Sequence, residues 1–310
     1  MSGPLRVGLI GLGVMGRHHA RVLRGLDGVR LVGVVDPAGD PDGAVHGTPV
    51  HAEPAGLLAR GLDYAVVACP TGAHEEVGLA LAAHGVPALI EKPLGGSAAA
   101  AGRLVRAFEE RRLLAAVGHV ERFQPVLKEL RARLPELGVL SQVLTERQAP
   151  LGGRAARTGV VQDLATHDLD LTRWLTGREY AWLAARTVRR PGAAVEGAAA
   201  VLGELADGTL VSHQVGRLGP VRRRTVVVTG EHGRLAADML AGTLLRQGPG
   251  VEQLLRPPAA PDALTAQHRE FAAAVAGRGG RVVALREGLR AVELAESVLA
   301  RATRSDGVTV

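Results

Sequence analysis

A glycine-rich turn between an apolar strand and a helix constrains the fold of this chain more than any other feature. Residues 5–10 read LRVGLI, an apolar run that predicts a strand, and glycines follow at positions 11, 13 and 16 as the pattern becomes helical. Gly11 permits a tight turn, Gly13 leaves the backbone open to a pyrophosphate, and Gly16 lets the helix pack closely on the strand. The stretch therefore predicts a dinucleotide-binding turn.

The acidic residue Asp36 ends the next apolar run and lies 20 residues after Gly16. Its carboxylate can accept hydrogen bonds from the ribose hydroxyls of a dinucleotide, and it would repel a 2′-phosphate. We therefore expect NAD as the cofactor and disfavour NADP. The first helical residues, Val14 and Met15, are expected to offer backbone N–H groups to the phosphates, since a helix N-terminus carries free donors and partial positive charge.

Strands and helices go on alternating as far as about residue 122, which predicts a Rossmann-type, doubly wound parallel sheet over residues 1–122. In such sheets the ligand binds at the carboxyl ends of the strands. Polar motifs follow three of the later predicted strands. From them we expect cofactor contacts by Cys69, Pro70, Thr71, His74, Glu91, Lys92 and Glu121, and substrate contacts by His119 and Arg122. Cys69 is interpreted as a small strand-end residue, because no base partner for a catalytic thiol is evident.

Residues 123–310 have a different pattern, with long strand-like runs joined by short turns. One of these turns is Asp207-Gly208, a pair typical of hairpins. Two helical patterns follow near the C-terminus, over residues 264–280 and 285–302. We therefore predict a second α/β domain over residues 123–310, built on a large, mostly antiparallel sheet, which binds the substrate.

One helical segment, residues 163–177, interrupts these strands and carries Asp163 and His167. Residues four apart share a face of an α-helix. A histidine can act as a base near neutral pH, and a neighbouring carboxylate can orient its ring and stabilise its protonated form. The alternative is an N-cap at Asp163 and a core or surface histidine at 167. A metal site is disfavoured, because the segment has one histidine and no paired cysteines.

Lysine is rare in this chain, since Lys92 and Lys128 are the two lysines among 37 Lys and Arg residues. Lys92 follows a predicted strand in the motif EKP. A compact ammonium group can stabilise developing alkoxide charge and can lose a proton, whereas arginine is bulky, planar and permanently charged. We predict that Lys92 is catalytic. The alternative is an ordinary surface lysine at a strand end.

Five stretches together resemble the Gfo/Idh/MocA family of nicotinamide-dependent oxidoreductases: GLIGLGVMGRHHARVL, ACPTGAHEEVGLALAAHG, EKPLGGS, GHVERFQP and DLATHDLDLTRWL. The last two, with RQAP, are similar to the branch that includes UDP-N-acetylglucosamine 3-dehydrogenases. The resemblance implies that Lys92 is the catalytic lysine and that Asp163 and His167 form the acid–histidine pair. Ala165 and Glu121 stand where many members have glycine and asparagine, which bears on the substrate.

The resemblance also implies a Rossmann domain followed by an open sheet through which subunits associate, as a homodimer or homotetramer. The implied activity is hydride transfer between NAD and a secondary alcohol of a sugar, favoured at the 3-hydroxyl of a nucleotide-linked amino sugar. Arg147, Arg154 and Arg157 lie in segment 146–158 and are predicted to contact a diphosphate, the alternative being a solvated loop. A free inositol, sugar or aminoglycoside is the alternative substrate, and a non-catalytic dinucleotide-sensing regulator is the alternative class.

Composition narrows the remaining classes of protein. The net charge of +6 would suit a nucleic-acid partner, but the arginines are dispersed and the seven aromatic residues offer few stacking surfaces, so we expect none. No run reaches the ~18 apolar residues that cross a bilayer, and the N-terminus lacks a signal-peptide pattern. The single cysteine, Cys69, leaves no intrachain disulfide. We therefore expect a cytoplasmic enzyme.

Overall fold

The computed structural model describes residues 3–150, 158–190 and 192–306 of the chain. Contacts divide the chain into two compact units. Unit 1 consists of Met1–Val120 and Pro261–Val292, and unit 2 consists of Glu121–Ala260 and Glu293–Val310. The predicted division at one point, between residues 122 and 123, differs from this one because the chain returns to unit 1 near its C-terminus.

Unit 1 is built on a six-stranded sheet in which all neighbouring strands are parallel. The order β3-β2-β1-β4-β5-β6 is that of a doubly wound dinucleotide-binding fold, which confirms the predicted parallel sheet. Most of these strand residues are buried, in keeping with their continuous apolar runs. The strands are β1 (Leu5–Ile10), β2 (Val29–Val35), β3 (Val50–His51), β4 (Tyr64–Val67), β5 (Ala88–Ile90) and β6 (Ala115–Val117).

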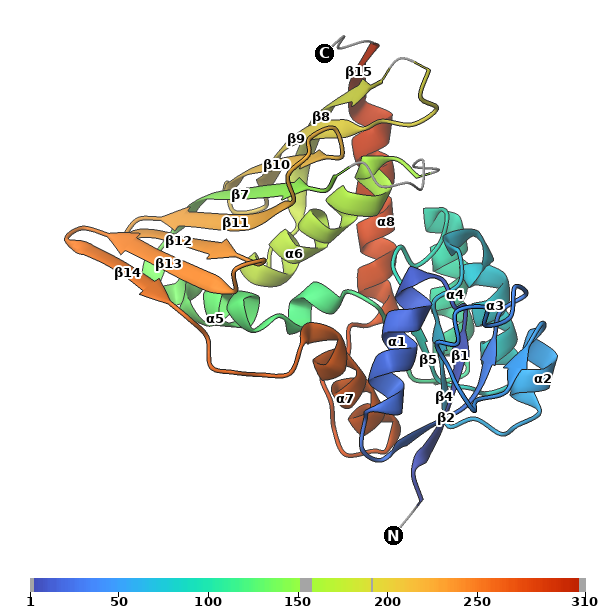
Figure 1. Cartoon of the computed structure of the whole chain (residues 1–310). Helices are drawn as coiled ribbons and strands as arrows, with labels where there is room; N and C mark the ends of the chain where they lie inside the picture. Colours follow the sequence, from blue (N-terminus) through green and yellow to red (C-terminus); the bar gives the residue numbers. More distant parts are fainter. Residues whose placement is uncertain (1–2, 151–157, 191, 307–310) are drawn as a thin grey trace. The chain divides into compact units, whose positions relative to one another are not determined.

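The helices of unit 1 come from both ends of the sequence (Figure 1). They are α1 (Val14–Arg24), α2 (Pro54–Leu58), α3 (His74–Ala83), α4 (Ala98–Glu110) and α7 (Ala263–Val275), while α8 (Leu285–Arg301) begins in unit 1 and ends in unit 2. Phe271 of α7 packs edge-on against Tyr64 of β4, with the ring centroids 5.2 Å apart. Both rings lie in one buried apolar cluster, which explains why α7 belongs to this unit.

Unit 2 contains a nine-stranded sheet of order β14-β13-β12-β11-β7-β10-β9-β8-β15. Its pairs are antiparallel except β7–β10 and β8–β15, so the predicted mostly antiparallel sheet is confirmed. The predicted Asp207-Gly208 turn joins β9 to β10, whereas the β13–β14 hairpin was not predicted. The strands are β7 (Leu140–Gln148), β8 (Tyr180–Arg189), β9 (Ala198–Leu205), β10 (Leu210–Gly216), β11 (Arg223–Gly230), β12 (Gly233–Asp238), β13 (Thr243–Gly248), β14 (Val251–Leu255) and β15 (Ala302–Asp306).

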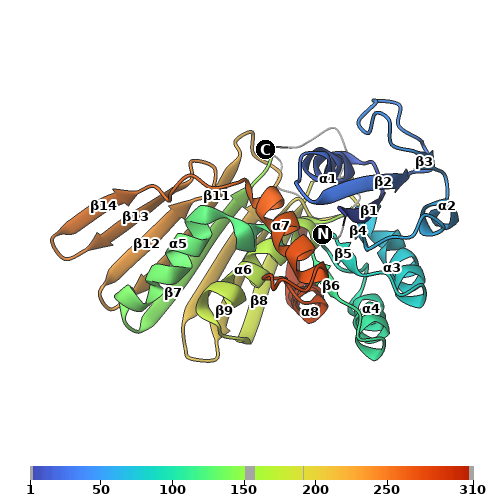
Figure 2. The same ribbon diagram turned by 90° about the horizontal axis from the view of Figure 1, so that it is seen from below.

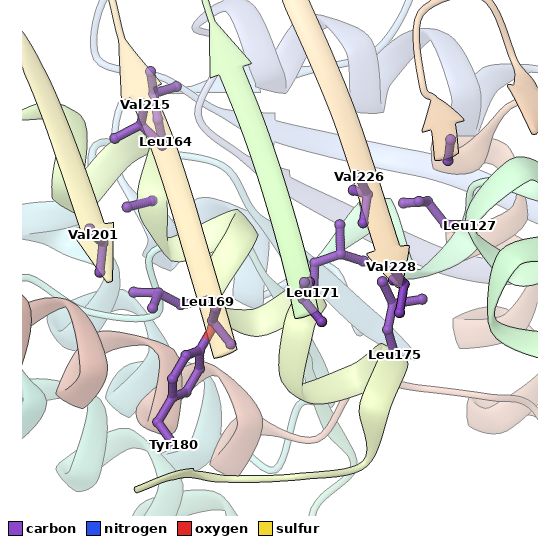
Figure 3. Close-up of a cluster of buried hydrophobic side chains, with 14 of the residues drawn as sticks. Leu127, Leu164, Leu169, Leu171, Leu175, Tyr180, Val201, Val215, Val226 and Val228 are labelled. Atoms are coloured by element: carbon purple, nitrogen blue, oxygen red, sulfur yellow. The ribbon is translucent and has the colours of Figure 1, made fainter. Parts of the chain in front are cut away.

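Helices α5 (Pro125–Arg133) and α6 (Thr166–Thr176) lie against one face of this sheet (Figure 1 and Figure 2). Leucines from both helices interdigitate there with valines of the strands, and Figure 3 shows part of this core. Along β9 the buried and exposed residues alternate, as a half-buried strand requires. Among the described residues, no helix is long and apolar enough to cross a membrane.

Candidate active site

The glycine-rich turn between β1 and α1 needs two of its glycines for the fold itself. Gly11 has a φ of 99°, and a Cβ there would lie 2.5 Å from the backbone nitrogen of Cys69. A Cβ on Gly16 would lie 1.9 Å from the carbonyl oxygen of Gly11. Both positions therefore exclude any side chain, as the sequence pattern predicts.

Gly13 is different, because nothing in the fold requires a glycine there. Its φ is −60°, which any residue adopts, and a Cβ would meet no atom within 4 Å. Gly13 caps α1 without a side-chain hydrogen bond, and the first turn of the helix carries no acidic residue. Val14 and Met15 therefore begin α1 beside an open space at Gly13, as the approach of a dinucleotide phosphate to this turn requires. The residues present fit such a cofactor.

Asp36, at the end of β2, holds this turn in place. One carboxylate oxygen accepts the N–H of Leu12 at 2.6 Å, and the other accepts the N–H of Ala38 at 2.9 Å. Each oxygen keeps a further lone pair. The carboxylate is thus fixed at the cofactor turn and can still accept a ribose hydroxyl. Its part in shaping the turn was not predicted.

The residues after β4 are fixed through the backbone. Cys69 and Pro70 precede the short helix η1 (Thr71–Ala73), and α3 begins at His74. The buried His74 ring places Nε2 3.0 Å from the carbonyl oxygen of Cys69 and Nδ1 3.0 Å from that of Pro93. His74 therefore joins two strand ends, where the sequence predicted a cofactor contact.

Burial decides the chemistry of the single cysteine. It raises the pKa of the Cys69 thiol to about 11, so the group is a neutral thiol at physiological pH. This agrees with interpreting Cys69 as a small strand-end residue.

Glu91 and Lys92 directly follow β5, and the peptide bond between Lys92 and Pro93 is cis. Glu91 is buried, with 5% of its surface exposed, and its Oε2 accepts the backbone N–H of Lys92 at 3.1 Å. Burial by itself would raise the pKa of Glu91, but a hydrogen bond from His19 and the charge of Lys92 hold it below its usual value. The backbone of Lys92 thus lies beside a buried carboxylate. At the end of the neighbouring β6, His119 is also buried.

In unit 2, Asp163 lies in a π-helical turn, η4 (Val161–Ala165), that leads into α6, where His167 lies. A π turn is wider than an α turn, and such turns occur frequently at functional sites. The two residues thus lie on either side of the junction between the π turn and α6, and their predicted pairing stays a prediction. The Asp163 carboxylate accepts a hydrogen bond from Arg217, which also donates to the carbonyl oxygen of Thr158 at 3.0 Å.

Glu121 lies beside His167, with Oε2 3.6 Å from the ring Nδ1. The same carboxylate accepts two hydrogen bonds of 2.7 Å from Arg147 of β7. Arg147 also donates to Asp168 of α6 at 2.9 to 3.2 Å. The sequence predicted a cofactor contact for Glu121 and a substrate contact for Arg147, but this guanidinium is 2% exposed and holds two carboxylates.

The charges of this cluster are strongly coupled. Burial alone would lower the pKa of Arg147, yet the attraction of Asp168 and Glu121 raises it far above its usual value. Burial raises the pKa of Asp168 despite the opposing effect of Arg147. Arg224 also acts electrostatically on both carboxylates, so the negative charge nearest to the His167 ring is that of Glu121.

Arg122 is also paired within unit 2. Its guanidinium binds the Asp170 carboxylate through two hydrogen bonds, of 2.9 and 2.5 Å, and both side chains are mostly buried. Arg154 and Arg157, the other arginines predicted to bind a substrate, lie outside the described residues. Within residues 3–150, 158–190 and 192–306, no cluster of three or more His, Cys, Asp or Glu side chains is arranged to hold a metal ion.

The predicted site residues thus fall into two groups, one at the strand ends of unit 1 and one around α6 in unit 2. Sequence reasoning missed His19, His268, Asp168 and Arg217. A signal for His19 existed, because it lies on the face of α1 that also buries Ala20 and Leu23. For the other three, no spacing in the sequence connects them to their partners.

Comparisons with known proteins agree with this arrangement. Residues 5–119 match a model described as the GFO/IDH/MocA oxidoreductase family, NAD-binding Rossmann fold, and residues 141–236 match the GFO/IDH/MocA C-terminal domain. An inositol 2-dehydrogenase of Saccharopolyspora erythraea is 34% identical over 61% of this chain and 59% of its own length. The rhizopine catabolism protein MocA of Rhizobium meliloti is 31% identical over 69% of this chain and 72% of its own length.

Two solved structures resemble nearly the whole chain. UDP-N-acetylglucosamine 3-dehydrogenase GnnA of Acidithiobacillus ferrooxidans superposes with a TM-score of 0.88 at 28% identity, over 97% of this chain and 98% of that one. GenD2 from gentamicin A biosynthesis, solved with NAD, superposes with a TM-score of 0.83 at 27% identity, over 97% and 95% of the two chains.

Proposed function

The chain belongs to the GFO/IDH/MocA family of oxidoreductases, and from this premise we propose that it is an NAD-dependent dehydrogenase acting on a secondary alcohol of a sugar or polyol. The observation that carries the proposal is Gly13, a glycine that the fold does not need and that leaves space at the N-terminus of α1. A dinucleotide phosphate accounts for that space, because its approach to the backbone excludes a side chain.

The chemistry is divided between the two groups of residues. A bound nicotinamide supplies the hydride acceptor. The alcohol must also lose its hydroxyl proton, and we assign its removal to His167, whose ring can bind a proton near neutral pH. Glu121 stabilises the imidazolium that results, and Asp163, held by Arg217, supports the same segment. The Lys92 ammonium stabilises negative charge on the substrate oxygen.

Asp36 supports NAD in preference to NADP. Two backbone N–H groups already fix its carboxylate at the cofactor turn. The negative charge would face a 2′-phosphate, which it repels, whereas it can accept hydrogen bonds from two ribose hydroxyls.

For the substrate, we propose the 3-hydroxyl of a nucleotide-linked amino sugar. The likeness to GnnA over 97% of the chain supports this choice. A free inositol is the second candidate, and a specific observation favours it. Arg147 was predicted to bind a diphosphate and Arg122 to contact the substrate, but both are already paired with carboxylates. Of the three arginines predicted to contact a diphosphate, Arg154 and Arg157 then remain.

We further propose that the outer face of the unit 2 sheet binds a second copy of this chain. Trp182, Leu202 and Leu210 point away from the core and are 51%, 53% and 56% exposed. They lie on the neighbouring strands β8, β9 and β10, with the exposed Glu204 between Trp182 and Leu210. Large apolar groups gathered on one exposed face of a sheet favour association. Light scattering should give a dimer or tetramer, and Leu202→Glu should shift it towards the monomer.

Formation of NADH provides the direct test of the activity. The purified chain would be mixed with NAD or NADP and with UDP-N-acetylglucosamine, myo-inositol, glucosamine or an aminoglycoside. We expect NADH formation with the UDP-sugar and NAD. Turnover of inositol alone would select the second candidate. Tight NAD binding by calorimetry without turnover of any alcohol would contradict a dehydrogenase and favour a dinucleotide-sensing regulator.

A further inference from the structure

Unit 1 contains a buried row of three titratable side chains behind Lys92. His19 of α1 places Nε2 3.0 Å from Oε1 of Glu91, and its Nδ1 lies 2.8 Å from Nε2 of His268 on α7. Both histidines are 0% exposed. The row joins the cofactor-binding helix, the strand end that bears Lys92, and a helix from the far end of the sequence.

The positions of the protons follow from the last atom of the row. Nδ1 of His268 is buried and has no hydrogen-bond partner among the described residues. An unsatisfied buried N–H is costlier than an unsatisfied lone pair, so Nδ1 is unprotonated and His268 carries its proton on Nε2. Burial lowers the pKa of His268 well below its usual value, which keeps this ring neutral.

The remaining protons are then determined. Two ring nitrogens 2.8 Å apart share one proton, which His268 supplies, so Nδ1 of His19 accepts. A neutral His19 that accepts at Nδ1 must carry its own proton on Nε2, where it donates to Glu91. Both N–H bonds of the row therefore point towards the Glu91 carboxylate.

Glu91 has few other charged neighbours. The hydrogen bond from His19 and the charge of Lys92 lower its pKa, and its own charge acts on His74, which packs from α3. Each of these groups can lose or gain a proton. The charge on Glu91 therefore depends on groups that can lose or gain a proton. Because electrostatic interactions are reciprocal, an ionised Glu91 favours the ammonium form of Lys92.

We propose that His19 and His268 are positioning residues for Lys92, which they serve by fixing Glu91 as an oriented carboxylate. The inference rests on the proposed function, because it presupposes that Lys92 takes part in turnover. His268 fixes the tautomer of His19, His19 donates to Glu91, and Glu91 holds the backbone of Lys92 and favours its charged form.

Paired substitutions separate this role from simple packing. His268→Gln keeps an N–H donor near the position of Nε2, whereas His268→Leu keeps a similar volume without a donor. We expect His268→Leu to lower kcat about tenfold, the scale of one hydrogen bond to a charged network, with an unchanged KM for NAD. The acid limb of its kcat profile should move to higher pH, because Glu91 then binds a proton more readily. His268→Gln should restore both kcat and the profile.

The control is His18, the neighbouring residue on α1, whose side chain is exposed. His18→Leu should leave kcat and the pH profile unchanged, and His19→Leu should reproduce the effect of His268→Leu. Equal behaviour of His268→Leu and His268→Gln, whether both active or both impaired, would contradict the proposal, since only the donor distinguishes them.

A measurement without turnover keeps this inference separate from the proposed function. With ¹⁵N-labelled histidine, two-bond nitrogen–proton correlations identify the protonated ring nitrogen. We expect protonated Nε2 and unprotonated Nδ1 on both His19 and His268 at pH 7.5, with the His19 pattern lost in His268→Leu. An unprotonated Nε2 on His19 would overturn the inference whatever the enzyme does. An inactive wild type with the expected tautomers would instead contradict only the proposed function.

Discussion

Unit 1 surrounds its buried carboxylate, Glu91, with imidazole rings and one lysine, whereas unit 2 clamps Glu121 and Asp168 with the guanidinium of Arg147. Histidine and lysine can change their charge within an enzyme site, but arginine cannot. The cations beside Glu91 can therefore gain or lose a proton, while the guanidinium that pairs with Glu121 and Asp168 keeps its charge. Under the proposed function, this difference accounts for a lysine at position 92 in a chain so rich in arginine.

Replacing the lysine of unit 1 by arginine should have the largest effect on turnover. We expect Lys92→Arg to lower kcat about 10³-fold, nearly as much as Lys92→Ala, because a bulky and permanently charged group replaces one that fits beside Glu91 and can lose a proton. NAD affinity, measured by calorimetry, should change little. Lys128→Arg is the matched control, because Lys128 is exposed and its contact with the Phe123 ring is open to arginine as well. Near-normal turnover by Lys92→Arg would refute the role of a titratable group.

Removing the permanent cation of unit 2 should mainly affect stability. Arg147→Met leaves Glu121 and Asp168 buried without their counter-charge, and we expect a loss of about 3 kcal/mol in the free energy of unfolding, measured with urea. Arg223→Met is the control, since its ion pair with Glu146 is largely exposed and should contribute less than about 1 kcal/mol. If Arg147→Met and Arg223→Met lost the same free energy of unfolding, the buried cluster would contribute no more than an exposed ion pair.

The sequence predicted one of these regions better than the other. The glycines, Asp36 and the strand ends of unit 1 are recognisable because a parallel sheet brings its carboxyl ends to one edge. That rule locates Lys92 without knowledge of any side-chain contact. That α7 packs in unit 1 was not predicted, because the pattern of a helix does not show which hydrophobic core the helix joins. His268 therefore had no visible connection to Glu91.

In unit 2 the contacts depend on strand register and helix type, which spacing does not determine. Arg147 and Glu121 are 26 residues apart in the sequence, and the segment 146–158 read as an arginine-rich loop. Asp163 lies in a π turn and His167 in α6, so their predicted pairing stays a prediction. The contact of His167 with Glu121 was not foreseen, because the two residues are 46 positions apart in the sequence.

Glu121→Gln tests whether the carboxylate of unit 2 acts on the proposed base, His167. The amide keeps an acceptor for Arg147 but removes the negative charge 3.6 Å from the His167 ring. The imidazolium form of His167 is then less favoured, so we expect the acid limb of the kcat profile to move to lower pH and kcat to fall about tenfold. A steady-state pH series provides the measurement. Glu146→Gln, on β7 next to Arg147 and partly exposed, should leave the profile in place. An unmoved acid limb in Glu121→Gln would show that Glu121 does not act on His167.

The smallest effects concern two histidines that are buried in a neutral state, His268 in unit 1 and His213 in unit 2. Burial lowers the pKa of both, that of His213 to about 3 with a further contribution from Arg147. Below about pH 6.5 the histidines of the unfolded chain bind protons, whereas the two buried rings of the folded chain do not. The free energy of unfolding therefore decreases as the pH is lowered below about 6.5. Replacing either ring by Gln should make this slope shallower, by at most about 1.4 kcal/mol per pH unit.

Stability at pH 8, where neither ring titrates, should separate the two variants. His213 has both ring nitrogens bonded, to the hydroxyls of Thr145 and Tyr180 at 2.8 Å, whereas His268 has one bonded nitrogen. His213→Gln should therefore lose about 1 kcal/mol more than His268→Gln in urea unfolding at pH 8, since one further buried group is left without a partner. His18→Gln should match the wild type in its stability at pH 8 and in its loss of stability below pH 6.5. A larger loss for His268→Gln would mean that the unpartnered nitrogen of His268 has a partner after all, and the proton order inferred for unit 1 would then be wrong.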